Sequence, residues 1–149
     1  MSSPARSSLD HALANFLAEV KPSRGVRCRI FVLGKSHALQ PAIQDQLILI
    51  GREAVINALR HYDATEIEVE IQYLRNFLCI LVRDNGCGIS QEAVLSARDS
   101  HCGLRGMRER AESIGARFDL WSGPHAGTEV RVAVPLEIAI ARAVPRGLP

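Results

Sequence analysis

The sequence predicts a two-layer α/β sandwich in which helices cover one face of a mixed β-sheet. Three observations support this fold class. Three segments have apolar residues at helical spacing, several shorter segments alternate apolar and polar residues as strands do, and neighbouring strands along the chain are joined by hairpin-like turns. At 149 residues, the chain is long enough for one continuous core and too short for two comfortable ones.

The overall charge is close to neutral. The chain carries 18 basic and 16 acidic residues, so no net electrostatic field favours nucleic acid or a membrane surface. The longest apolar runs, such as residues 47–50, are far shorter than the roughly 20 residues that a membrane span needs. Residues 1–8 have no apolar core and do not form a secretory signal. We therefore expect a cytoplasmic domain that contacts neither nucleic acid nor membrane, although the full-length protein could carry an anchor.

Four cysteines bear on metal binding and on the redox setting. Cys28, Cys79, Cys87 and Cys102 form no C-x-x-C pair, and no histidine stands near them at zinc-ligand spacing. The sequence therefore predicts neither a structural metal nor a disulfide framework, which fits a reducing compartment.

The chain begins with a leader, a short helix and a strand. Residues 1–8 are expected to be flexible, and Ser8 can cap a helix whose apolar stripe ends at Val20, so residues 1–25 form a leader and short linker helix. This stripe either packs on its own domain or continues a dimer-forming helix. Residues 26–33 then alternate apolar and basic side chains, which predicts a half-buried strand.

A long helix is predicted from Pro41 to about residue 62. Apolar residues cover most of its circumference, which is typical of a buried helix. Glu53, Asn57 and Arg60 nevertheless lie on one stripe of it, because residues three and four apart share a helix face. Burying an unpartnered amide costs roughly 1–3 kcal/mol and a charge costs more, so the stripe faces either a bound ligand or water.

The second half of the chain is predicted to form two hairpins separated by one helix. The strand at residues 77–82 has apolar residues on both faces, so it should be central in the sheet. Residues 90–101 are polar and look mobile, residues 26–136 are expected to form the domain, and residues 137–149 a tail that frays after Pro135. The remaining elements are strands at 65–74, 117–121 and 128–134 and a helix from 103 to a terminator at Gly115.

Two glycine-rich segments are candidates for ligand binding. Asp84-x-Gly86-x-Gly88 follows the central strand, where glycines permit close approach of the backbone to a flat ligand. An ionised Asp84 can accept a hydrogen bond from an exocyclic amine such as that of adenine. Gly103-x-x-Gly106 opens a helix whose first amides have no internal partner, which suits a phosphate.

In order, these segments resemble the ATP-binding domain of the GHKL superfamily, which has the Bergerat fold. Residues 52–61, Arg-Glu-Ala-Val-Ile-Asn-Ala-Leu-Arg-His, look like its N box, and residues 84–89 and 103–110 look like its two glycine boxes. Residues 127–135 are similar to the closing glycine-threonine strand. Within the superfamily, E-x-x-x-N-x-x-R-H, a short lid and G-L-x-G-M-R-E-R look like sensor histidine kinases that feed LuxR/NarL-type response regulators.

The resemblance implies an enzyme that binds Mg-ATP and transfers the γ-phosphoryl group to a histidine in two-component signal transduction. It implies that Glu53 is the general base or the water-orienting group, and that Asn57 is a ligand of Mg²⁺. The other residues that it implies for ATP binding are Arg60, His61, Asp84, Gly86, Gly88, Ile89, Gly103, Leu104, Arg105, Gly106, Met107 and Thr128.

One part of such a kinase has no counterpart in this sequence. No segment resembles the dimerisation helix with the phosphorylated histidine, so the acceptor is expected in a missing part of the same protein or on another chain, with a response regulator downstream. Two alternatives share the fold: a nucleotide-responsive binding module without transfer activity, and an anti-sigma-type serine kinase. Cys87 and Cys102 flank the proposed site, and a redox latch between them is less favoured than a filler role.

Overall fold

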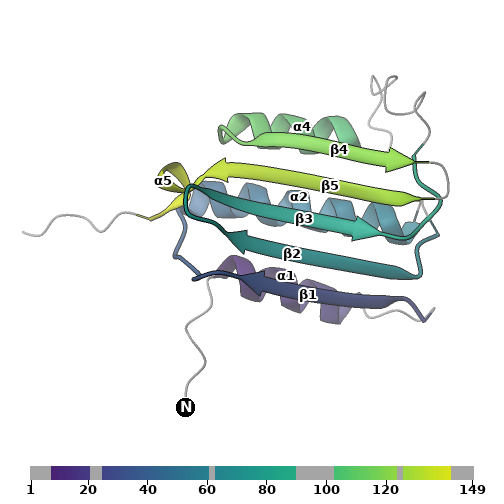
Figure 1. Ribbon diagram of the computed structural model, residues 1–149. Helices are drawn as coiled ribbons and strands as arrows, with labels where there is room; N and C mark the ends of the chain where they lie inside the picture. Colours follow the sequence, from purple (N-terminus) through teal and green to yellow (C-terminus); the bar gives the residue numbers. More distant parts are fainter. Residues whose placement is uncertain (1–7, 21–24, 61–62, 90–102, 124–125, 142–149) are drawn as a thin grey trace, which may run out of the picture.

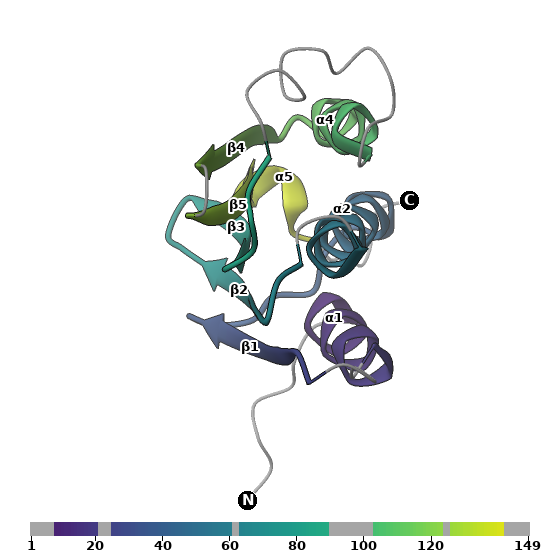
Figure 2. The ribbon, with the colours of Figure 1, turned by 90° about the vertical axis from the view of Figure 1, so that its right-hand side faces the viewer.

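The computed structural model describes residues 8–20, 25–60, 63–89, 103–123 and 126–141. Within them, helices lie on one face of a five-stranded sheet (Figures 1 and 2), which confirms the predicted two-layer sandwich. The order of the strands is β1-β2-β3-β5-β4, with β1 parallel to β2 and the other pairs antiparallel. The elements are α1 (Ser8–Glu19), β1 (Arg27–Leu33), α2 (Pro41–Arg60), β2 (Glu66–Tyr73), β3 (Phe77–Asp84), α4 (Leu104–Ser113), β4 (Arg117–Gly123), β5 (Gly127–Pro135) and α5 (Leu136–Ala139).

The core lies between the sheet and the three longer helices. β3 is the middle strand, and Leu78 to Val82 are buried on both of its faces, which confirms its predicted central position. From the helical layer, α2 contributes Leu47, Ile50 and Ala54 at the three- and four-residue spacing of one helix face. This packing places the carboxy-terminal half of α2 behind the end of β3 (Figure 1).

The linker helix packs on its own domain. Leu9 and Leu13 of α1 are almost fully buried, and α1 contacts α2 and β1. A Cβ atom on Gly51 would lie 3.0 Å from Leu13 Cδ2, so the two helices approach closely at this glycine. The first of the two alternatives for the apolar stripe of α1 is therefore the observed one.

A buried carboxylate fastens α1 to the sheet. Asp10 is 1% exposed and accepts hydrogen bonds from Ser36 Oγ at 2.6 Å and from Tyr73 Oη at 2.8 Å. Burial of a carboxylate is tolerated when hydrogen bonds replace its water. Nothing in the sequence pattern of residues 8–20 pointed to this network, because its partners are 26 and 63 residues away.

Replacing Tyr73 by phenylalanine should therefore destabilise the fold. The change removes a donor to a buried charge and keeps the ring, so we expect the free energy of unfolding to fall by about 1.5–3 kcal/mol. Urea denaturation would measure this, with Trp121→Phe as the control because Trp121 is 57% exposed. A loss below about 0.5 kcal/mol would show that the Tyr73–Asp10 bond contributes little.

The chain does not fray directly after Pro135, and that expectation is wrong for residues 136–141. Leu136 and Ala139 of α5 are buried, and Leu39 and Ile140 form an isolated β-bridge. The amide of Gln40 donates to the carbonyl of Ala139 at 2.8 Å. The short apolar stretch after Pro135 is held by the segment that precedes α2, a contact between residues about 100 positions apart.

Candidate active site

The polar stripe of α2 is divided between the protein interior and its surface. Asn57 is 2% exposed, Glu53 is half-buried one turn earlier, and Arg60 is exposed at the last residue of the helix. A buried amide and a half-buried carboxylate do not fit a helix face that simply lies in water. The stripe as a whole therefore does not lie in water, and its contact with a ligand stays a prediction.

The start of α4 lies directly against Glu53. Gly103 has a φ of 65°, and a Cβ atom at this position would overlap the carboxylate of Glu53. Glu53 and Gly103 line a pocket of about 220 Å³ together with Leu49, Gly106, Met107 and Arg110. The structure therefore brings a half-buried carboxylate to the amino-terminal end of a ten-residue helix, where the free amides and the helix dipole favour an anion.

The side chains at the start of α4 differ in their surroundings. Leu104 and Met107 are buried, so their side chains belong mainly to the core. Arg105 is exposed and its Nε lies 2.9 Å from Glu109 Oε1. Arg110 donates to Gln46 Oε1 at 3.1 Å, and Arg108 stacks on the ring of Phe118. Of these three arginines, Arg110 also lines the pocket of Glu53 and Gly103, whereas Arg105 and Arg108 do not.

Asp84 stands at the end of β3, on the helix-covered face of the sheet. It pairs in register with Thr128 of β5, and the amide of Gly86 donates to Asp84 Oδ1 at 2.8 Å. Burial raises the pKa of Asp84, while hydrogen bonds from the amides of Gly86 and Thr128 oppose that shift. The carboxylate and the buried Thr128 hydroxyl therefore occupy neighbouring positions at one end of the sheet.

Two glycines allow the loops around Asp84 to touch. Gly88 has a φ of 80°, and a Cβ atom there would overlap the carbonyl oxygen of Gly123. Gly127 has a φ of 82°, and its Cβ atom would overlap the carbonyl oxygen of Asp84. The glycine at position 88 is thus required by contact between two backbones, in addition to any approach of a ligand.

Ser122 is a residue of this region that the sequence analysis missed. Its hydroxyl accepts a hydrogen bond from the amide of Ile89 at 2.5 Å and lies 3.1 Å from Thr128 Oγ1. It also donates to the carbonyl of Gly127 at 3.3 Å. Ser122 appeared to be part of the linker in the last hairpin, and no pattern distinguishes a serine that bonds to a loop 33 residues away.

We expect Ser122→Ala to loosen the loop that follows β3. Loss of a half-buried hydroxyl that satisfies an amide should lower the free energy of unfolding by about 1 kcal/mol and weaken nucleotide affinity several-fold. Thermal denaturation and nucleotide titration would measure the two effects, with Ser113→Ala, at the exposed last residue of α4, as the control. Unchanged affinity in Ser122→Ala would remove Ser122 from the site.

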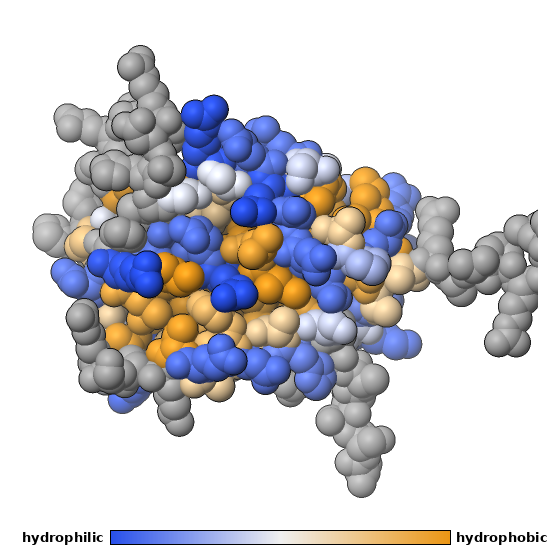
Figure 3. Space-filling model, turned by 180° about the vertical axis from the view of Figure 1, so that it is seen from behind, coloured by the Kyte–Doolittle hydropathy of each residue, from blue (hydrophilic) through white to orange (hydrophobic). Residues whose placement is uncertain are grey.

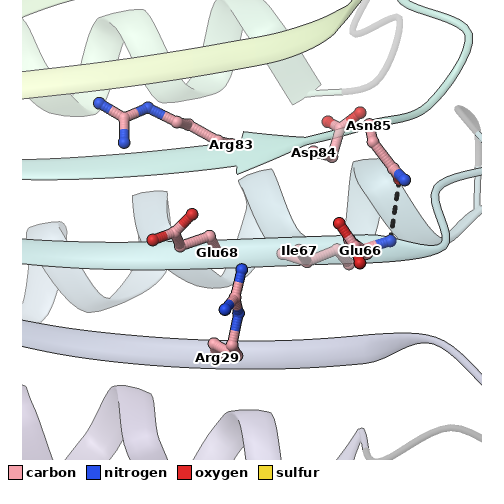
Figure 4. A pocket seen from close by; sticks show the side chains of 7 residues that line it. All are labelled: Arg29, Glu66, Ile67, Glu68, Arg83, Asp84 and Asn85. Atoms are coloured by element: carbon pink, nitrogen blue, oxygen red, sulfur yellow. Dashed lines mark hydrogen bonds between the residues drawn. The ribbon is translucent and has the colours of Figure 1, made fainter.

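Asn85 connects the same loop to the start of β2. Its Oδ1 accepts from the amides of Thr65 and Glu66 at 2.9 and 2.8 Å, and its Nδ2 donates to Thr65 Oγ1 at 2.8 Å. Figure 4 shows Asn85 bonded to the backbone of Glu66, with Asp84 beside it at the end of β3. Asn85 therefore holds the end of β3 against the start of β2.

One expected site residue and two neighbouring features are not in the described part of the chain. His61 lies outside it, as do the segment 90–101, which was expected to be mobile, and Cys102 of the possible redox latch. Cys87 is exposed. Among the described residues, no group of three His, Cys, Asp or Glu side chains could hold a metal ion, and no helix is long and apolar enough to span a membrane.

The family model for histidine kinase-, DNA gyrase B-, and HSP90-like ATPases matches residues 42–138. The chain belongs to this family. The match includes α2, the loop after β3 and the start of α4, so all the expected ATPase boxes lie within it. This confirms the predicted ATP-binding catalytic domain at the level of the ATPase family.

Curated relatives of this ATPase domain are sensor proteins. The chain is 39% identical over 94 residues to sensor protein VraS of Staphylococcus haemolyticus, and equally so to VraS of Staphylococcus aureus. These alignments cover 63% of this chain and 26% of each relative, so the chain spans about a quarter of the length of the relatives that it matches.

Solved structures of histidine kinase domains share the ATPase fold. The histidine kinase domain of the blue-light activated kinase EL346 from Erythrobacter litoralis has a TM-score of 0.69 at 19% identity, covering 87% of this chain and 59% of that chain. The ATP-binding domain of PrrB from Mycobacterium tuberculosis has a TM-score of 0.66 at 21% identity, with 85% and 90% covered. At these identities the similarity establishes the fold, and it confirms the expected Bergerat class.

Proposed function

We propose that this ATPase domain binds Mg-ATP and donates the γ-phosphoryl group to a histidine outside the chain, as the catalytic domain of a sensor kinase. The observation that carries the proposal is the contact between Glu53 and Gly103. It joins a carboxylate suited to general-base work to a helix start suited to phosphate. A protein that only bound nucleotide would not need a carboxylate at this point.

The residues divide into a phosphate end and an adenine end. At the phosphate end, Asn57 would hold Mg²⁺ jointly with the ATP phosphates, and the amides of 103–106, with Arg60 and His61, would contact the phosphates. The ion supplies charge neutralisation when bound. Glu53 would accept a proton from the attacking group or orient it. These assignments rest on the buried amide of Asn57 and the position of Glu53 one turn away.

At the adenine end, Asp84 would accept a hydrogen bond from the exocyclic amine. Gly86, Gly88 and Ile89 would lie along the ring, and Thr128 would hold the same end through water. The register between Asp84 and Thr128 supports this, because it places the carboxylate and the hydroxyl at adjacent strand ends. The Ser122 bonds to Ile89 and Thr128 support a site in which these loops move as one unit.

The partners proposed for the whole protein follow from the same reasoning. A histidine-bearing dimerisation domain would supply the acceptor, and a response regulator of the LuxR/NarL type would receive the phosphoryl group. The similarity to sensor protein VraS supports a sensor context, since it reaches 39% identity over 94 residues of this chain. A cytoplasmic location remains a prediction.

The decisive experiment mixes this chain with labelled ATP and a separately made pair of dimerisation helices. We expect a phosphorylated product that is labile in acid and stable in base, as phosphohistidine is. An acid-stable phosphoprotein would support a serine kinase instead, and ATP binding with no transfer to any offered acceptor would support a binding module.

A further inference from the structure

The first strand of the sheet has one free edge. β1 pairs only with β2 among the described strands (Figure 1), and the amide of Arg27 donates to the carbonyl of Thr65 at 2.8 Å. Backbone groups alternate in direction along a strand, so the N–H and C=O groups of Cys28, Ile30 and Val32 point away from β2. Within the described residues, no hydrogen bond uses those groups. The edge therefore offers positions for an added strand.

A groove runs between this edge and α1. It has a volume of about 480 Å³ and a mostly apolar lining, to which α1 contributes Ala14, Leu17 and Ala18 and the strand side contributes Val26, Cys28 and Ile30. Arg27 and Arg29 also line it. Figure 2 shows α1 beside β1 at this end of the sheet, and Figure 3 shows patches of hydrophobic surface on the helical side of the molecule. The two alanines leave the space that larger side chains would fill. Burial raises the pKa of the Cys28 thiol, which favours its neutral form.

The other face of β1 is basic. Arg27 has a side chain that is 80% exposed and lies 4.0 Å from Glu66, and Arg29 is in register with Glu68. Figure 4 shows Arg29 reaching from β1 towards β2, next to the strand that carries both glutamates. An added strand would therefore meet apolar surface on the helix side of the sheet and arginines on its open face.

The strand already paired with β1 indicates what the free edge would accept. In β2, Glu66, Glu68 and Glu70 alternate with Ile67, Val69 and Ile71, so that carboxylates lie in register with Arg27, Arg29 and Phe31 while the aliphatic residues enter the core. A segment with the same alternation, paired with the free edge of β1, would likewise place carboxylates beside the arginines and aliphatic side chains on the helix side of the sheet. A second copy of β1 fits less well, because it would gather four arginines on one face of the joined sheet.

We propose that the free edge of β1 and the groove beside α1 bind an extended peptide segment of a partner protein in which acidic and apolar residues alternate. The segment would add a sixth strand to the sheet, its backbone bonding to Cys28, Ile30 and Val32. Its apolar side chains would enter the groove, and its carboxylates would lie near Arg27 and Arg29. The edge of β1 and its groove lie apart from the ATPase site, since β1 and β3 are not neighbours in the sheet. On the open face, Arg29 lines the same pocket as Asp84 (Figure 4).

The probe is an end-capped, fluorescently labelled peptide with the sequence of residues 66–73. Titration into the whole chain should give saturable binding that weakens as salt rises, and a peptide with lysine in place of each glutamate should bind at least tenfold more weakly. Two further peptides, N-methylated on alternate amides, separate strand addition from other modes. Binding should be abolished only in the peptide whose methylated amides would face β1. If both methylated peptides still bound, the proposal would be overturned.

Variants of the protein locate the site. Ala18→Phe, which fills the groove from an exposed position, should weaken peptide binding at least tenfold, whereas Ala42→Phe, at an exposed position of α2, should not change it. Bound peptide should also slow alkylation of Cys28 at least fivefold. Equal affinity in Ala18→Phe and the unmodified chain would exclude this groove. Since neither measurement uses ATP, failure here and failure of the proposed kinase activity are distinguishable.

Discussion

Replacing Glu53 by glutamine is expected to lower phosphoryl transfer by about 10²–10⁴-fold while ATP affinity stays within about twofold. The range is that of a positioned general base, and glutamine preserves the size and hydrogen-bonding reach of the side chain. Glu53 touches the start of α4 at Gly103, so the variant keeps the packing and loses only the basic oxygen. Single-turnover transfer to the acceptor helices and a nucleotide titration would measure the two quantities.

The matched control for this prediction is Glu112→Gln. Glu112 is an exposed glutamate on α4, the helix whose start contacts Glu53. It should transfer phosphate at the unmodified rate. Transfer by Glu53→Gln within about fivefold of the unmodified chain would assign the base to another residue, even if ATP binding were intact.

Replacing Asp84 by asparagine is expected to weaken ATP binding by about 10–100-fold. A hydrogen bond to a charged group contributes roughly 1.5–3 kcal/mol, and the new amide also offers a donor where the adenine amine needs an acceptor. The proposed pairing uses the carboxylate at the end of β3, beside Thr128. Equal ATP affinity in Asp84→Asn and the unmodified chain would refute the adenine assignment. Asp119→Asn, an exposed change on β4, serves as the control.

Asp84→Asn is expected to weaken ATP binding, but to increase the stability of the nucleotide-free fold over part of the pH range. Burial raises the pKa of Asp84 above its ordinary value of 3.8, so folding disfavours its ionised form. The contribution of the protonated Asp84 carboxyl to the free energy of unfolding is fully present below pH 3.8. It is lost as pH rises through the raised pKa of the folded state. In the nucleotide-free chain, Asp84→Asn should therefore gain stability relative to the unmodified chain over that interval. Urea denaturation from pH 3 to 7 would measure this, and a relative loss would contradict it.

The expected loss of ATP affinity and the expected gain in stability of Asp84→Asn have one physical cause. Asp84 is partly withdrawn from water, which penalises the free carboxylate and strengthens any hydrogen bond that a ligand donates to it. Residues kept at a cost to stability are typical of functional sites. A purely structural aspartate at the end of a strand would be expected to favour its ionised form.

Local patterns predicted most of the secondary structure because each depends on neighbouring residues. The period of apolar residues located α2 and the central β3, and Pro41 marked the start of α2 as the structure has it. Strand ends were less well predicted: β3 continues to Asp84 because that residue pairs with Ile67 and Thr128 on the two adjacent strands. Those partners are invisible from the sequence around position 84.

The sequence by itself determined the fold class and predicted the main ligand-binding segments, since a polar stripe on an apolar helix and two glycine-rich loops are short-range features. Only the tertiary structure decided how these segments meet: that Glu53 touches Gly103, that Ser122 holds Ile89, that Asp10 anchors α1, and that Leu136 begins a packed helix. Each of these contacts joins residues far apart in the chain. Such contacts depend on burial and on backbone geometry, which no local pattern of residues encodes.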